Sequence, residues 1–166
     1  MKKSTYRFLN IIYGGLCGLF TGVVMMQLWI HNNMTPAMLY MLIFDQMKIF
    51  HLLSDVYSIR EKIILNIAHY VTAMMFGIVF ALILHRLVKN LWNGLGLGFM
   101  FGIVWWILTP FYLLPFFFVV SPNAQWKDLT MYELLNSLIS HIIFGLVLGF
   151  FYALFCMLLR RQARRG

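Results

Sequence analysis

The segment GGLCGLFTGVV at residues 14–24 decides the fold, because it returns as GLGLGFMFGIV at residues 94–104. Both copies carry a glycine at every fourth position, and this spacing places the three glycines on one face of a helix. A second pair of segments matches in the same way, HYVTAMMFG at 69–77 and HIIFGLVLG at 141–149. In that pair a histidine precedes two small residues at four-residue spacing. The sequence therefore predicts one helical hairpin that occurs twice.

Small residues allow membrane helices to approach one another closely, and this is how such helices associate in lipid. We therefore expect the helices of each hairpin to pack through their small residues. These are Gly14, Gly18, Gly22, Ala73, Gly77, Gly94, Gly98, Gly102, Gly145 and Gly149.

The composition excludes an ordinary soluble domain. Hydrophobic residues make up 62% of the chain and charged residues 11%, against about 25% charged residues in soluble proteins, and the mean hydropathy is +0.82. Crossing about 30 Å of hydrocarbon takes roughly 20 apolar residues. We predict an all-α membrane protein in which residues 1–166 form one domain with four spans, at about 9–30, 63–84, 91–113 and 134–159.

Charge asymmetry predicts the orientation. The acids Asp45, Asp55, Glu61, Asp128 and Glu133 all fall in the two longer connections between spans. The opposite ends of the spans carry Lys2, Lys3, Arg7, Arg86, Lys89, Arg160, Arg161, Arg164 and Arg165. The positive-inside rule then places both termini and the turn at 85–90 in the cytoplasm, and we expect a bacterial inner membrane. The net charge of +8 accordingly points to anionic lipid as the partner and away from nucleic acid.

Two connections have predicted structure of their own. Residues 36–53 mix apolar and polar side chains after Thr35-Pro36, which predicts a short amphipathic helix on the outer membrane surface. Pro110 and Pro115 interrupt the apolar run that follows the third span. They favour an aromatic surface stretch at 111–120 over one long kinked helix.

The two histidines are the candidate functional residues. His69 and His141 each lie six or seven residues from the outer start of their span, so both sit roughly 10 Å below the outer surface at about 1.5 Å per residue. Ionisable side chains inside a membrane are costly and therefore suggest function. Gly22 and Gly102 reach the same depth on the preceding spans.

Three roles for these histidines stay open. They can be neutral residues that hydrogen-bond between helices, which requires no ligand and is the role we expect. They can be the two axial ligands of a haem b, in a protein that carries electrons. They can also form a proton or ion relay, although none of the four spans contains an acid or a Lys or Arg residue.

A separate run of soft ligands suggests copper. Thioether and imidazole groups suit Cu(I), and the run on the outer side contains Met25, Met26, His31, Met34, Met38, Met41, Met47 and His51. Methionine is also a flexible apolar filler, and the run lacks a compact Met-x-Met repeat. We therefore expect no metal site here.

Catalysis is not expected. Ser121, Ser137 and Ser140 have no base and acid arranged around them, the glycines are spaced for helix contacts and not for cradling phosphate, and no HExxH motif occurs. These observations favour a non-enzymatic helical module that associates with itself or with a larger membrane complex.

Several residues of the second half resemble a known family. The stretch Leu91-Trp92-Asn93-Gly94-Leu95 is followed by Gly98, Pro110, Pro115, Trp126, Glu133 and His141. This set resembles the YagU-like small bacterial inner-membrane proteins. The resemblance implies a four-helix inner-membrane protein with a proline-aromatic outer loop before a histidine-bearing last helix, and it implies no mechanism.

Overall fold

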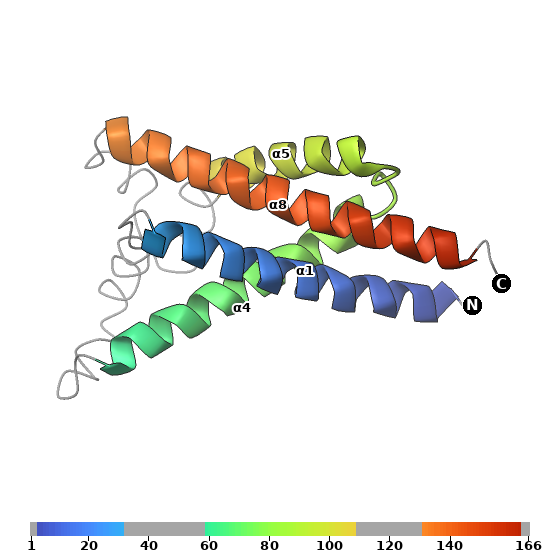
Figure 1. The fold of residues 1–166 in the computed structure, drawn as a ribbon, viewed down its shortest axis with the longest axis horizontal. Helices are drawn as coiled ribbons and strands as arrows, with labels where there is room; N and C mark the ends of the chain where they lie inside the picture. The colour runs from blue at the N-terminus through green and yellow to red at the C-terminus, as the bar shows by residue number, and fades with distance from the viewer. Residues whose placement is uncertain (1–2, 32–58, 109–130, 164–166) are drawn as a thin grey trace.

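The computed structural model describes residues 3–31, 59–108 and 131–163, and these residues form four α-helices. They are α1 (Lys3–His31), α4 (Ile59–Leu84), α5 (Leu91–Leu108) and α8 (Met131–Ala163). In Figure 1, α1 begins and α8 ends at the same end of the bundle, and the turn between α4 and α5 lies toward that end as well. The all-helical class predicted from the sequence is confirmed.

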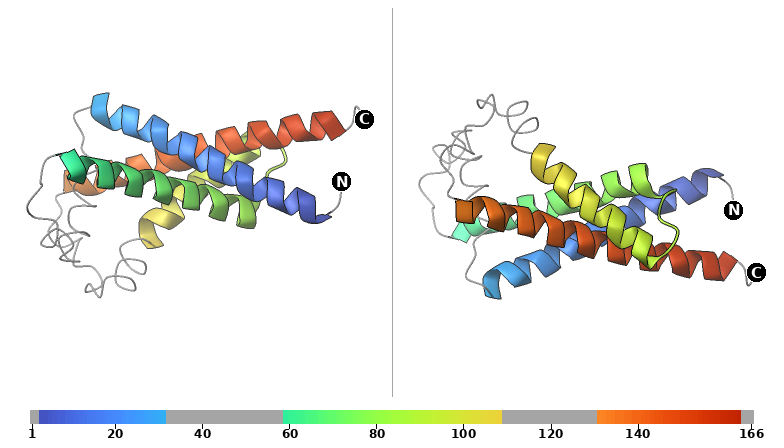
Figure 2. Two further views of the ribbon diagram at one scale, coloured as in Figure 1. Left: turned by 90° about the horizontal axis from the view of Figure 1, so that it is seen from below. Right: turned by 90° about the horizontal axis from the view of Figure 1, so that it is seen from above.

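The helices pair as the repeated motif predicts. α1 packs against α4, α5 packs against α8, and α1 also runs alongside α8. Figure 2 shows the two partners of each pair crossing at an angle. The chain is therefore two helical hairpins joined by a short turn.

Three of the helices are long and apolar enough to cross a membrane. Their candidate spans are Phe8–Leu28, Leu91–Leu108 and Leu134–Arg161. The apolar part found for α4 is shorter, His69–Leu84. The expected surface helix at 36–53 and the stretch at 111–120 lie outside the described residues, as do residues 109–113 of the third predicted span.

Local hydrogen bonds explain why α5 begins where it does. The side chain of Asn90 accepts a hydrogen bond from the backbone N–H of Asn93 at 2.8 Å, which is the N-cap arrangement. Asn93 returns the contact, because its side-chain oxygen accepts from the N–H of Lys89 at 3.1 Å. α4 ends at Leu84 in a tight turn, in which the backbone N–H of Leu87 donates to the carbonyl oxygen of Leu84 at 2.9 Å. Two helices of opposite direction are thus joined by six residues.

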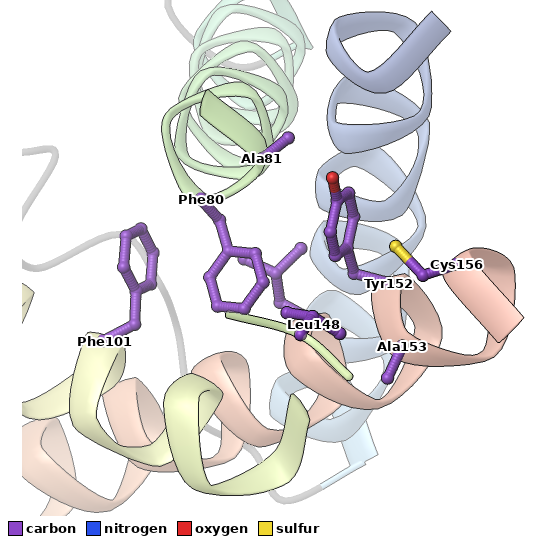
Figure 3. Close-up of a cluster of buried hydrophobic side chains, with 8 residues drawn as sticks. Phe80, Ala81, Phe101, Leu148, Tyr152, Ala153 and Cys156 are labelled. Carbon is purple, nitrogen blue, oxygen red and sulfur yellow. The ribbon is translucent and has the colours of Figure 1, made fainter. Parts of the chain in front are cut away.

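Aromatic side chains fill the space between the two hairpins. Phe80 of α4 and Tyr152 of α8 are both 0% exposed, and their ring centroids lie 5.5 Å apart in an edge-to-face arrangement. Figure 3 shows them side by side, with Phe101 of α5 beyond Phe80 and with Leu148 near Tyr152. On the other side, Tyr13 of α1 stacks on Phe155 of α8 at 3.5 Å. The core is therefore the junction between the hairpins.

Candidate functional site

The interface inside the first hairpin has no room for side chains. A β-carbon built on Gly77 would lie 2.7 Å from the Cα of Gly18, and one on Gly22 would lie 2.8 Å from the Cβ of Ala73. Real Cβ atoms essentially never approach other heavy atoms within 3.0 Å. Gly14 continues the same line of contact, against Gly77 and Ala81. The small residues of α1 and α4 thus bring the two backbones into direct contact.

The second hairpin repeats this interface. A β-carbon on Gly98 would lie 3.1 Å from the Cα of Gly149, and one on Gly145 would lie 2.9 Å from the backbone nitrogen of Gly102. Gly94 faces Ala153 and Gly149, as Gly14 faces Ala81 and Gly77. The small residues predicted from the sequence to pack between helices therefore all lie at one of these two contacts.

His69 bridges α4 and α1 at the end of the first contact that lies away from the start of α1. Its side chain is 5% exposed, and its Nε2 lies 3.0 Å from the carbonyl oxygen of Gly22. Since a carbonyl can only accept, Nε2–H is the donor, and in the neutral ring the lone pair is on Nδ1. Gly22 has no side chain, so the imidazole can reach the backbone of α1.

His141 occupies the matching position in the second hairpin but bonds differently. Its Nδ1 lies 2.8 Å from the carbonyl oxygen of Ser137, one turn earlier in its own helix. Nδ1–H is the donor here, which leaves the lone pair of the neutral ring on Nε2. The atom nearest to a β-carbon built on Gly102 is the backbone carbonyl oxygen of His141. The two histidines therefore hold their protons on opposite ring nitrogens.

The two histidines belong to different interfaces. His69 lies between α1 and α4, and His141 lies on α8 beside α5. Over residues 3–31, 59–108 and 131–163, no group of three or more His, Cys, Asp or Glu side chains is placed to hold a metal ion. Of the run suggested for copper, Met25 and Met26 are buried, at 2% and 6% exposed. The rest of that run past His31 lies outside the described residues.

An arginine near the end of α8 contacts the turn between the hairpins. The guanidinium of Arg160 donates to the carbonyls of Val88 and Lys89, at 2.7 and 2.8 Å. The Val88 side chain is 1% exposed and packs in the core between the hairpins. Arg160 thereby pairs two backbone carbonyls of the turn at 85–90, which lie outside both helices.

Two of these features were missed from the sequence. Arg160 was grouped with the basic residues that orient the chain, and nothing in the run of four arginines distinguishes it from Arg161. The aromatic core had a partial signal, because Phe80-Ala81-Leu82 and Tyr152-Ala153-Leu154 occupy matching places in the two copies.

No family model matches the sequence, and comparisons with curated proteins and with solved structures gave no match either.

Proposed function

We propose that this chain is a non-enzymatic, multi-pass protein of the bacterial cytoplasmic membrane, which serves as a helical module that associates with itself or with a larger membrane complex. The observation that carries the proposal is the engagement of both histidines by backbone carbonyls, at 3.0 Å for His69 and 2.8 Å for His141. The His69 bond joins two helices and the His141 bond lies within α8, and neither bond requires a ligand. These bonds support a structural role for both histidines.

The outward face of α5 supports association. Gly96 lies outside the hairpin contact, with open space where a β-carbon would be. Trp92 and Met100, one turn to either side, are 81% and 56% exposed. A glycine that faces outward between large apolar side chains lets a further helix approach closely, as Gly18 and Gly98 do inside the chain.

The experiment compares the protein's mass and its companions in the membrane. Full-length protein is extracted in a mild detergent, and its mass is measured by light scattering while co-purifying proteins are identified by mass spectrometry. We expect a complex larger than one chain, reduced by Gly96→Leu. A monodisperse single chain without stoichiometric companions would contradict the proposal.

The proposed orientation has both termini in the cytoplasm. Supporting it, the start of α1, the end of α8 and the turn that Arg160 contacts lie toward one end of the bundle, and the lysines and arginines concentrate there. The same topology follows from the resemblance to YagU-like proteins. A fluorescent protein fused to the C-terminus should fluoresce in cells, whereas a non-fluorescent fusion would indicate the opposite orientation.

A second candidate function rests on His141 alone. A histidine that donates Nδ1–H to a backbone carbonyl and keeps a lone pair on Nε2 has the arrangement common to metal-bound histidines. This favours haem b or metal binding through His141, with His69 released from Gly22 to supply a second ligand. An absorption spectrum of the purified protein, combined with metal analysis, decides: a colourless and metal-free sample contradicts this candidate.

A further inference from the structure

Asn10 of α1 is a polar side chain in an apolar position. It is 4% exposed, and neither its amide nitrogen nor its amide oxygen has a hydrogen-bond partner among the described residues. The Nδ1 of His85, just past the end of α4, is also buried and has no partner there. Buried polar atoms nearly always have a partner, from the protein or from ordered water.

The register of the first hairpin brings these two side chains to one level. Along α1 the contact positions are Gly22, Gly18 and Gly14, and along α4 they run in the opposite direction to Ala81. One further step of four residues on each helix reaches Asn10 and His85. Both then lie on the faces that α1 and α4 turn toward each other, at the end of the bundle where Arg160 meets the turn.

The second hairpin lacks this pair. The residue that matches Asn10 there is Asn90, whose side chain caps α5 and is thereby satisfied at 2.8 Å. The residue that matches His85 is Met157, which has no hydrogen-bonding nitrogen. The two unpartnered polar groups are therefore a property of the first hairpin alone, and they occur together.

The chemistry of the pair selects the ligand. An amide offers two donors and an acceptor, and the imidazole nitrogen can act as either. A molecule that satisfies both must donate and accept within a very small space, which water does and a cation or an anion does not. Buried waters typically bond about three otherwise unsatisfied polar groups. In the orientation proposed above, this level lies at the membrane interface, where water is present.

We propose that Asn10 and His85 bind ordered water between α1 and α4, and that this hydrated site closes the end of the first hairpin next to the turn at 85–90. The hydrated site ties the start of α1 to the end of α4 where their small-residue contact has ended. It acts at the opposite end of that contact from the His69–Gly22 bond, so the hairpin is held by polar contacts at both ends.

Water contact at Asn10 is the direct test. The full chain is labelled with ¹⁵N-asparagine in perdeuterated detergent, and the Asn10 amide is assigned by its loss in Asn10→Leu. We expect cross-relaxation between the Asn10 amide protons and water in the unaltered protein. An Asn10 amide without any water contact overturns the proposal, and the water contact itself is measured on the unaltered protein.

A thermal-unfolding cycle tests the pairing with His85. If water joins the two residues, Asn10→Leu lowers Tm in the native chain but has a smaller effect in His85→Phe. If Asn10 binds no water, Asn10→Leu raises Tm or leaves it unchanged. If Asn10→Leu changes Tm equally in the native chain and in His85→Phe, the pairing of the two residues is wrong. Asn90→Ala is the matched control, because the loss of that cap should be the same with or without His85.

Discussion

At the scale of single residues, the two histidines show how a repeated motif acquires two roles. Each begins the same pattern of small residues, yet His69 bonds across the interface to Gly22 and His141 bonds back to Ser137. The difference lies in which nitrogen can reach a carbonyl, and it fixes opposite tautomers. Equivalent positions in the repeat therefore do not determine which ring nitrogen of a histidine donates a hydrogen bond.

This difference gives a prediction with a matched pair of variants. A glutamine amide can stand in for an Nε2–H donor, whereas the shorter asparagine stands in for Nδ1–H. His69→Gln should keep most of the stability, while His69→Asn should lose about 1 kcal/mol, the usual contribution of such an interhelical bond. Thermal unfolding in detergent measures both.

The same two substitutions at His141 provide the control, with the order reversed. His141→Asn keeps a donor near the Ser137 carbonyl and should be the milder change. If glutamine and asparagine rank alike at both positions, the assignment of opposite tautomers is wrong.

Arg160 gives a second prediction at this scale. Its two hydrogen bonds to the carbonyls of Val88 and Lys89 are lost in Arg160→Gln, which should cost about 1 kcal/mol and lower Tm by roughly 2–4 °C in a chain of this size. Arg161→Gln removes the same charge from the neighbouring exposed position. Equal shifts in Tm for the two variants would show that charge matters and the carbonyl contacts do not.

At the scale of elements, each hairpin is a pair of helices in backbone contact. Much of this could be predicted from the sequence, because glycines spaced by four mark both the contacting face and the partner. The angle between the helices and the packing of α1 on α8 could not be predicted. These depend on large side chains such as Phe20 of α1 and Phe151 of α8, whose ring centroids lie 4.6 Å apart. In the sequence, nothing distinguishes these two from the other residues among the 16 phenylalanines.

Two glycines of α5 should respond in opposite ways to the same substitution. At Gly98 even one added carbon meets the backbone of Gly145 and Gly149, so Gly98→Leu must force the helices apart and should cost well over the roughly 1–3 kcal/mol of ordinary overpacking. At Gly96 nothing lies within 4 Å, and leucine also has the better helix propensity. Gly96→Leu should therefore leave the Tm of the single chain unchanged or raise it. Together the two variants test which face of α5 packs against α8.

At the scale of the whole molecule, the hairpins meet through residues that match each other in the repeat. Phe80 and Tyr152 occupy equivalent places and contact one another, as two copies of one residue would at a twofold axis. The polar tip of Tyr152 lies beside Cys156, on the side that faces α1 (Figure 3). Sequence comparison shows that these two residues match, but their mutual contact appears only once the hairpins are docked.

Truncating Phe80 should weaken the contact between the two hairpins while each hairpin stays folded. Phe80 also contacts Phe101 at 5.1 Å, so Phe80→Ala removes ring contacts to both α5 and α8 and should cost roughly 3 kcal/mol. Proteolysis within residues 85–90 should become faster, while the hydrogen-exchange protection of the Gly14–Gly77 contact is kept. Loss of protection throughout both hairpins would show that they do not fold as separate units.

The Arg160 contact also bears on the order in which the chain assembles. The carbonyls of Val88 and Lys89 are synthesised about seventy residues before the arginine that bonds them. During synthesis the first hairpin and its turn must therefore persist in the membrane with that turn open, until the last helix arrives and closes it. A chain arrested before α8 is complete would accordingly leave these two carbonyls without the Arg160 contact that the finished chain has.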